Sequence, residues 1–392
     1  MRHAVVLDIG SSKIVTLCAD RVGNDGLRVY GADIRAHAGF RFGKLLDAEN
    51  LKRTAVETLL AAERECGFRF KEITIAAPAA FTRVLVKKGS LKLSSQPKRI
   101  TGADIDMLIN TSMPKEPPEG FCLIHSTPFS YTLDGKKRYG LPQDAMAAKF
   151  EAEVSHVYVS TAFLEPVKGA IKYAGMQPGV CVSAALAQAL MVIPEKARNR
   201  PAILLDVGYT NTDVVIALQS AIIGQDVIES GGYHLASDLA YGFTVPLLSA
   251  EKVKRRYTFS LDYQDSTELI RTPEGTRSVD RAQVRQIIEA RAGELCFMID
   301  DALRELNVDV AAGPIIYLTG GGIAMMKGSR EYLQDMLGIR IRKDMPWMPR
   351  MNSPNYGSVF GAMEFILHAG ADTALQPLEG GVFSRLKGLF QK

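Results

Sequence analysis

The feature that most constrains this chain is a segment that occurs twice, about half a chain apart. The first copy reads VVLDIGSSKIV from Val5 to Val15, and the second reads ILLDVGYTNTDVV from Ile203 to Val215. Each copy is an apolar run, an aspartate, a glycine two residues later, small polar residues and a second apolar run. This pattern predicts a β-hairpin with a polar turn. The two aspartates, Asp8 and Asp206, are 198 residues apart, so the echo predicts two similar units within one fold.

The two turns suit a polyphosphate bound with a metal ion. Glycine lets the backbone approach an oxyanion, the amides and hydroxyls of the turn donate to it, and Lys13 adds a positive charge. Carboxylates repel phosphate, so we expect a hydrated Mg²⁺ between Asp8 and Asp206. A single Asp-x-Gly would be ordinary turn chemistry, but two matching copies favour the phosphate interpretation. The predicted binding residues are Asp8, Gly10, Ser11, Ser12, Lys13, Asp206, Gly208, Tyr209, Thr210 and Asn211.

Further glycines occur where a nucleoside would be held. A buried-type strand at 315–319 runs into Gly320, Gly321 and Gly322, followed by Met325 and a helix through 330–333. A glycine turn that opens a helix presents free N–H groups and lets a flat nucleoside lie against the backbone. The pair Gly231 and Gly232 precedes another predicted helix. Glu251 and Lys254 are three apart on a helical stretch and share one face, although a surface ion pair is the alternative there.

Composition limits the remaining possibilities. A length of 392 residues predicts two or more cores, and 47% hydrophobic with 23% charged residues is globular. A net charge of +4 is too small to indicate a nucleic-acid binder. Five cysteines without a CxxC pair read as reduced thiols rather than disulfides or a zinc site. We find no signal peptide and no apolar window of about 20 residues, and therefore expect a soluble, cytoplasmic chain.

These motifs together resemble the actin/Hsp70/sugar-kinase ATPase superfamily. The two hairpins look like its phosphate 1 and phosphate 2 motifs, the triple glycine looks like its adenosine motif, and Ser358 to Glu364 looks like its second connecting helix. The resemblance places Glu251 and Lys254 against the ribose and adenine. It implies an α/β, two-lobed actin-like (ribonuclease H-like) ATPase fold that binds ATP and Mg²⁺.

The segment from about Thr82 to Ser160 discriminates within the superfamily. It predicts strands at 83–86 and 91–93, a helix begun at Thr101, strands at 121–126 and 129–133, a hairpin turn at Asp134-Gly135 and a return strand at 150–159. This order resembles the 1C (SHS2-type) subdomain of the bacterial cell-division family FtsA. Further stretches similar to that family lie at 140–142, 231–234, 238–242 and 250–254, so the resemblance covers nearly the whole chain.

The resemblance implies a division into subdomains. Subdomain 1A comprises 1–82 and 161–200, with 1C inserted at 83–160. Subdomain 2A comprises 201–230 and 314–350, with 2B inserted at 231–313. A return helix to 1A, a linker and an amphipathic helix follow at 351–368, 369–381 and 382–392.

The last eleven residues carry an independent signal. At about 100° per residue their apolar side chains fall within an arc of about 120°, opposite the basic ones. Behind a Gly/Ala/Pro linker, this composition predicts an interfacial helix in which each basic residue adds about 1 kcal/mol near an anionic leaflet. FtsA proteins end in such a membrane-targeting helix; docking on the chain's own body or on a partner helix is the alternative. The predicted lipid-contacting residues are Val382, Phe383, Arg385, Leu386, Lys387, Leu389 and Phe390.

The sequence departs from the FtsA pattern at positions that bear on ATP hydrolysis. Ala184 stands where FtsA has an acidic residue, and Gln188 is the nearest substitute. Tyr209 and Asn211 replace the small residues of the second phosphate motif. We therefore expect ATP binding with weak or absent ATPase. The histidines His125, His156 and His234 have no partner at ligand spacing, so we interpret them as satisfied structural residues.

The resemblance implies a cytoskeletal adaptor at the division site. ATP favours head-to-tail self-association, the tail holds the polymer on the cytoplasmic face of the membrane, and subdomain 2B captures the C-terminal peptide of FtsZ. Basic candidates for that capture are Arg255, Arg285 and Arg291, and other division proteins would bind through 1C. One alternative is a PilM-like pilus platform protein. A less favoured one is a small-molecule phosphotransferase, for which we find no catalytic base.

Overall fold

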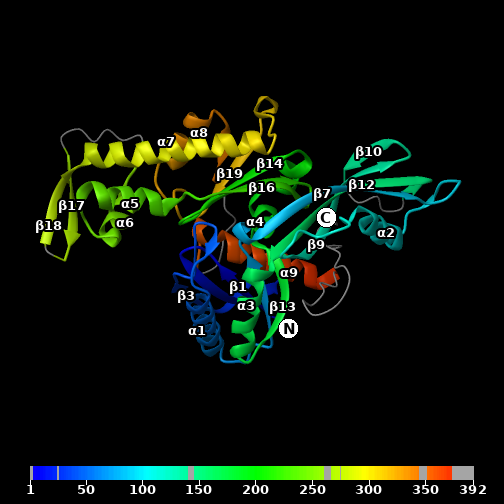
Figure 1. Cartoon of the computed structure of the whole chain (residues 1–392), viewed down its shortest axis with the longest axis horizontal. Coiled ribbons are helices and arrows are strands. Elements are labelled where there is room, and N and C mark those ends of the chain that lie inside the picture. The colour runs from blue at the N-terminus through cyan, green and yellow to red at the C-terminus, as the bar shows by residue number, and fades with distance from the viewer. Residues whose placement is uncertain are drawn as a thin grey trace.

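Two five-stranded sheets of the same topology form the two lobes of the molecule (Figure 1). The computed structural model describes residues 3–23, 26–139, 145–259, 266–273, 275–343 and 351–372. In the first sheet β1 (Ala4–Ile9), β2 (Lys13–Val22) and β3 (Gly26–Ala36) are antiparallel, and β6 (Glu72–Ala77) and β13 (Gln177–Ser183) continue parallel to β1. The second sheet repeats this with β14 (Ala202–Val207), β15 (Thr212–Leu218), β16 (Ala221–Ile228), β19 (Ile315–Thr319) and β20 (Arg340–Arg342). The hairpins predicted from the echo are β1–β2 and β14–β15, which confirms that prediction.

Two helices lie between the sheets and join the lobes into one core (Figure 1). They are α4 (Ala184–Val192) and α9 (Gly357–Asp372). Their apolar side chains form a single buried cluster with Val6 and Leu17 of the first sheet and Leu204 and Val215 of the second. On the far face of the first sheet, α1 (Ala48–Cys66) and α3 (Thr161–Tyr173) cover a second cluster. Burial on both faces explains why the strands read as nearly continuous apolar runs.

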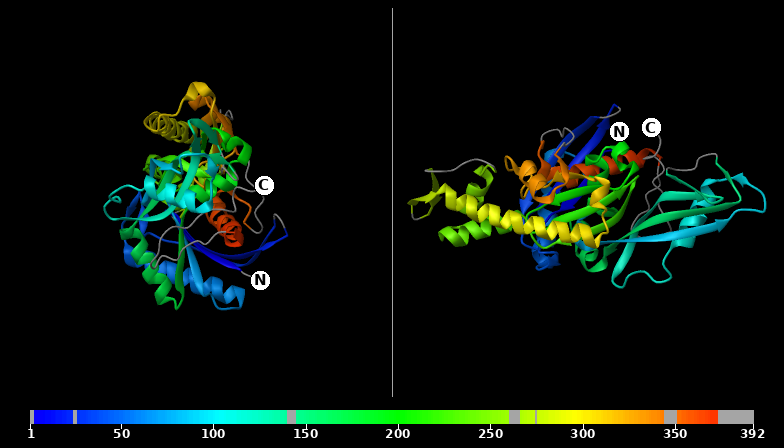
Figure 2. Two further views of the ribbon diagram at one scale, coloured as in Figure 1. Left: turned by 90° about the vertical axis from the view of Figure 1, so that its right-hand side faces the viewer. Right: turned by 90° about the horizontal axis from the view of Figure 1, so that it is seen from above.

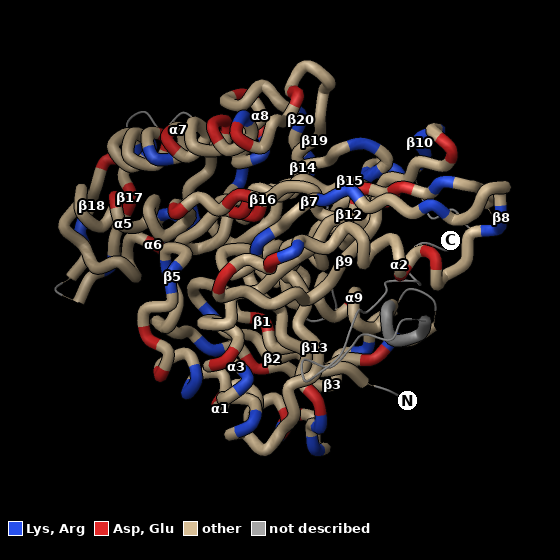
Figure 3. Tube along the Cα trace, turned by 45° about the vertical axis from the view of Figure 1, so that its right-hand side comes forward, with Lys and Arg blue, Asp and Glu red and all other residues tan. Residues whose placement is uncertain are grey.

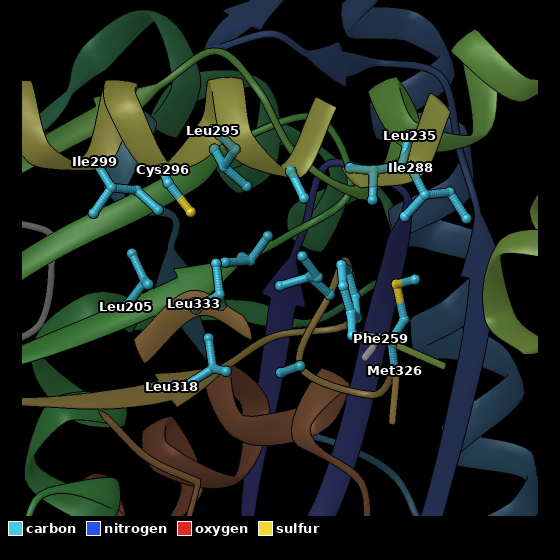
Figure 4. Packing of buried hydrophobic residues seen from close by; sticks show 14 of the residues in the cluster. Leu205, Leu235, Phe259, Ile288, Leu295, Cys296, Ile299, Leu318, Met326 and Leu333 are labelled. Carbon is cyan, nitrogen blue, oxygen red and sulfur yellow. The ribbon is translucent and has the colours of Figure 1, made fainter. Parts of the chain in front are cut away.

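The far face of the second sheet is covered by the 25-residue helix α7 (Arg281–Glu305). Leu205 and Leu318 of the sheet face Leu295, Cys296 and Ile299 of this helix (Figure 4). The helix α8 (Ser329–Leu337) packs against the same cluster through Leu333. We predicted that the glycines at 320–322 open this helix, but it begins at Ser329. The three glycines therefore lie in a loop before α8, and their amides do not form the N-terminus of that helix.

A four-stranded sheet projects from one side of the lobes (Figures 1 and 2). Its order is β10 (Lys136–Tyr139), β9 (Phe121–Leu133), β12 (Lys149–Ser160) and β7 (Thr82–Lys92). The helix α2 (Gly102–Ser112) covers one face, capped by Thr101 as predicted. We predicted two strands in place of β7 and two in place of β9, but each is one long strand paired with β12. The short strands β8 (Lys98–Arg99) and β11 (Met146–Ala147) pair at its tip, where Lys and Arg are frequent (Figure 3).

A second projection lies at the opposite end of the molecule (Figures 1 and 2). It consists of α5 (Gly232–Phe243), α6 (Leu247–Arg256), the hairpin of β17 (Thr267–Thr272) and β18 (Gly275–Asp280), and the start of α7. The remaining hairpin, β4 (Phe40–Arg41) with β5 (Lys44–Leu45), precedes α1. Within the described ranges, no helix is both long and apolar enough to cross a membrane.

The three histidines differ in how their rings are satisfied. His156 is hydrogen-bonded by Ser112 at 3.0 Å and by Ser126 at 2.7 Å. His234 Nδ1 accepts the Gly231 N–H at 3.1 Å. For these two residues the prediction of satisfied structural histidines is correct. It is wrong for His125, whose buried Nε2 has no hydrogen-bond partner in the part of the chain that the structure describes.

Candidate functional site

The turns of the two equivalent hairpins face one cleft between the lobes. The cleft encloses about 240 Å³. Most of the residues predicted from the sequence line it, among them Asp8 and Asp206, which are the two aspartates of the echo. The predicted residues that line the cleft are Asp8, Gly10, Ser11, Ser12, Lys13, Asp206, Gly208, Tyr209, Asn211, Glu251, Gly320, Gly321 and Met325.

Each turn is closed by the same backbone hydrogen bond. Gly10 N donates to Lys13 O at 3.0 Å, and Gly208 N donates to Asn211 O at 2.9 Å. An alanine Cβ at Gly208 would lie only 2.9 Å from that Asn211 oxygen, so the glycine is required by the tightness of the turn. The turns also touch each other, because Thr210 N donates to Ser11 Oγ at 3.2 Å.

Three aspartates with shifted pKa values line the cleft, besides Glu251. Burial raises the pKa of Asp8 to about 6, with the nearby Asp206 adding to the shift, while the Ser358 hydroxyl (2.6 Å from Asp8 Oδ1) and Lys13 oppose it. Burial raises the pKa of Asp206 to about 6 as well. Asp213, opposite Asp206 in the β14–β15 register, also lines the cleft, and burial raises its pKa well above the usual range. Burial lowers the pKa of Lys13 to about 8, so the site favours an additional cation.

Three glycines from different loops meet behind the cleft, and we call Gly208, Gly232 and Gly322 the glycine junction. Gly322 N donates to Val207 O at 2.7 Å, and Gly232 N donates to Gly208 O at 3.0 Å. A Cβ at Gly322 would lie 2.2 Å from Gly208 O, and one at Gly232 would lie 2.5 Å from Gly322 Cα. These loops therefore pack backbone against backbone.

Five predicted binding residues do not line the cleft but support those that do. Lys254 is buried and donates to Gly232 O at 3.0 Å while its Nζ lies 2.9 Å from Glu251 Oε2. The shared face predicted for Glu251 and Lys254 is thus present, with Glu251 toward the cleft. The five supporting residues are Thr210, Gly231, Gly232, Lys254 and Gly322.

Arg255 lies at the cleft, although we predicted that it binds a partner protein. It lines the cleft beside Glu251, to which its Nε donates at 2.8 Å. The other two predicted partner residues are paired within the chain: Arg285 with Glu289 at 3.2 Å, and Arg291 with Asp238 at 2.5 Å. The i, i+4 spacing from Glu251 to Arg255 is the signal that places both on one helix face.

The segment before and at the start of α9 contributes cleft residues that we did not select. Pro354, Asn355 and Ser358 line the cleft, and Lys13 Nζ lies 3.8 Å from the ring centroid of Tyr356. Asn355 Oδ1 and Asn211 Nδ2 are buried and lack hydrogen-bond partners among the described residues. Unpaired polar atoms at a cleft can accept or donate hydrogen bonds to a bound ligand, water or ion. Gln188 and Ala184 of α4 also face the cleft.

Some predicted features cannot be placed. The lipid-contacting residues at 382–392 and the stretch 140–142 lie outside the described residues. No group of three or more His, Cys, Asp or Glu side chains in the described part of the chain could ligate a metal ion directly. A metal at this cleft would therefore need water or phosphate oxygens among its ligands, as Mg²⁺ prefers.

Comparisons with known proteins agree with the resemblance seen in the sequence. The family described as "Cell division protein FtsA" matches residues 203–361. FtsA of Pseudomonas aeruginosa is 22% identical over 390 residues, covering 97% of this chain and 93% of that protein. FtsA of Neisseria meningitidis is 23% identical over 408 residues, covering 98% of this chain and 97% of that protein. The predicted resemblance to FtsA is confirmed.

Solved structures with the same fold cover 93% of this chain in each of three cases. The "PilM-PilN type IV pilus biogenesis complex" matches over 98% of its chain, with a TM-score of 0.62 and 18% identity. MreB5 of Spiroplasma citri bound to ADP matches over 96% of its chain, with a TM-score of 0.54 and 14% identity. The "MamK double helical filament" matches over 98% of its chain, with a TM-score of 0.52 and 13% identity. The predicted actin-like fold is confirmed.

Proposed function

We propose that this chain is an FtsA-like adaptor that binds ATP with Mg²⁺, self-associates, and tethers FtsZ to the cytoplasmic face of the membrane at the division site. The observation that carries the nucleotide part is that two equivalent Asp-x-Gly turns, one from each lobe, line a single cleft. Similarity to FtsA along nearly the whole chain supports the cellular role. The ADP-bound MreB5 neighbour supports nucleotide binding by this fold.

The residues present fit a magnesium nucleotide. The turn amides after Gly10 and Gly208, with Lys13 and the unpaired Asn211 amide, would hold the phosphates. Asp8 and Asp206 would hold the hydrated Mg²⁺, which neutralises phosphate charge. At the other end, Gly320 and Gly321 would let the nucleoside approach the backbone. Glu251, Arg255 and Met325 would contact it there.

We propose that turnover is slow or absent. Ala184 of α4 faces the cleft at the position that is acidic in the FtsA pattern, and its side chain cannot orient a water. Gln188 faces the cleft, but its Nε2 lies 3.5 Å from Thr319 Oγ1. Steady phosphate release by the purified chain, abolished in Asp206→Ala, would contradict this.

Nucleotide binding is tested by titrating a fluorescent ATP analogue with and without Mg²⁺. Asp206→Ala should weaken binding at least about tenfold, the loss expected when one charge-assisted contact to the metal is removed. Asp301→Ala, at an exposed position of α7, is the matched control and should bind as the wild type does. Equal binding by both variants would overturn the assignment of the cleft.

A second pocket suits the partner peptide. It encloses about 160 Å³ between α6, β17 and the start of α7, and its charged lining residues are Arg256, Glu268 and Arg281. Arg256 and Arg281 are both paired with Glu268. We propose that an acidic peptide, the C-terminal segment of FtsZ, binds here and that its carboxylates replace Glu268 as the partner of the two arginines. Arg256→Glu should then abolish FtsZ-peptide binding, whereas Arg304→Glu on the opposite end of α7 should not. Binding of a membrane-protein N-terminal peptide instead would favour a PilM-like platform.

Membrane attachment is assigned to the amphipathic C-terminal residues. A chain ending at residue 381 should stay unbound in flotation with vesicles containing anionic lipid, while the full chain floats. The full chain should bind neutral vesicles more weakly, because part of the attraction is electrostatic. Flotation of the shortened chain would remove the tether from the proposal.

A further inference from the structure

The β4–β5 hairpin of the first lobe contacts the second turn. Phe42 N donates to Thr210 Oγ1 at 3.1 Å, and Gly43 N donates to Asn211 Oδ1 at 3.3 Å. Beside them, Lys44 Nζ lies 3.9 Å from Glu229 Oε1. Both hydrogen bonds use backbone amides of one lobe and side chains of the other. The hairpin therefore contributes to the contact between the lobes.

The turn of this hairpin has an unusual residue at its tip. Phe42 has φ 49° and Gly43 has φ 68°, so both central residues are left-handed. Such two-residue turns favour Asn-Gly or Gly-Gly, and a bulky residue at positive φ is uncommon. The side chain must therefore gain something from this position. Its ring lies edge-on to Tyr233 at 5.8 Å and to His234 at 5.6 Å, both on α5 of the second lobe.

These rings lead back to the cleft. Tyr233 stacks edge-on with Tyr209 at 5.4 Å, and Tyr209 lines the cleft. The other end of the hairpin reaches the cleft too, because buried Phe40 lines it. We call Phe42, Tyr209, Tyr233 and His234 the aromatic cluster. Tyr209, which stands where a small residue was expected, joins this cluster through Tyr233 of its own lobe, and Phe42 joins it from the first lobe.

We propose that the β4–β5 hairpin is a latch: it holds the second turn in its cleft-facing position and must release the second lobe before a nucleotide leaves. This inference rests on the proposed nucleotide binding. A ligand held by turns of both lobes leaves only when those turns separate. The two hydrogen bonds and the aromatic cluster oppose that separation. Residues at the hairpin tip are thus positioning residues that set the exchange rate without contacting the ligand.

The test is the dissociation rate of a fluorescent ATP analogue, chased with unlabelled ATP in a stopped-flow instrument. Phe42→Ala removes the ring and keeps the turn amides. Dissociation should accelerate about 3- to 10-fold, the range expected for losing an aromatic pair contact. The matched control is Phe297→Ala on α7, where the ring is 68% exposed, and its rate should equal that of the wild type.

Hydrogen exchange of the peptide around 40–45 gives a second readout that needs no ligand. The Phe42 and Gly43 amides should be protected in the wild type and in Phe297→Ala, and exposed in Phe42→Ala. Fast exchange of these amides in the wild type would overturn the latch. If the wild type binds the analogue but Phe42→Ala releases it at the same rate, only the latch is refuted. If the wild type does not bind the analogue at all, both the latch and the proposed nucleotide site are refuted.

Discussion

Replacing Gly322 by alanine tests whether the glycine junction holds the two halves of the site together. The new Cβ would lie 2.2 Å from Gly208 O, 2.8 Å from Val207 O and 2.9 Å from Gly232 N. All three are backbone atoms, so no side chain can rotate away, and the loop must shift by roughly 1 Å in a closely packed interior. Overpacking of this kind costs about 1–3 kcal/mol. The loop next to Asp206 moves with it, so ATP affinity should fall together with stability.

The measurement is denaturant unfolding followed by circular dichroism, paired with titration of the ATP analogue. The control makes the same change at Gly169, an exposed position inside α3 where an added Cβ meets nothing within 4 Å. There alanine should stabilise the protein by about 0.5–1 kcal/mol, because it is the better helix former. Gly322→Ala with wild-type stability and ATP affinity would refute the close packing of the junction.

Three further predictions concern elements outside the cleft. Burial lowers the pKa of His125 to about 4. The stability that its neutral form contributes is therefore fully present above pH 6.5 and is lost as the pH falls through 4. His125→Gln should reduce this acid destabilisation by up to about 3 kcal/mol, measured as the free energy of unfolding against pH. Gln225 Nε2 lies 3.0 Å from each of three acceptors, Ala79 O, Thr82 O and Thr82 Oγ1. Gln225→Ala should lower the free energy of unfolding by about 1–3 kcal/mol, because these acceptors lose their donor. Gln286→Ala, at an exposed position, should change it little. Thr101→Ala breaks the capping box of α2 and should cost about 1 kcal/mol in thermal unfolding; an unchanged midpoint would contradict the cap.

The hairpins of the site were predictable because each is written in about eleven neighbouring residues. The apolar runs, the aspartate and the glycine are local, and they fix the turn without knowledge of the rest of the chain. The long strand β7 was not predictable in the same way. Its centre carries the exposed residues Lys87 and Lys88, which read as a break. Pairing with β12 runs from Lys149↔Lys92 to Val159↔Thr82, and this distant partner keeps the polar centre extended.

The cleft residues that sequence reasoning missed come from elements distant in the chain or were assigned to another role. Ser358 is bonded to Asp8 across 350 positions of sequence; the resemblance to a connecting helix marked its stretch but did not assign this residue to the site. Asn355 has no motif of its own either. Arg255 had a signal, since it lies one turn after Glu251, but its charge was read as a surface for an acidic partner. Which side of α6 faces the cleft depends on how the lobes pack, and the helix sequence does not contain that information.

The two turns of the repeated segment differ in the side chains that they bring to the cleft. The first turn carries Ser11, Ser12 and the cation Lys13, which is packed over Tyr356. The second carries no cation; its side chains, Thr210 and Asn211, accept hydrogen bonds from the latch hairpin instead. Since the backbone hydrogen bond closing each turn is the same, the difference lies in the side chains. In the proposed nucleotide site the first turn would therefore supply charge toward the phosphates, whereas the side chains of the second turn are bonded to the latch hairpin.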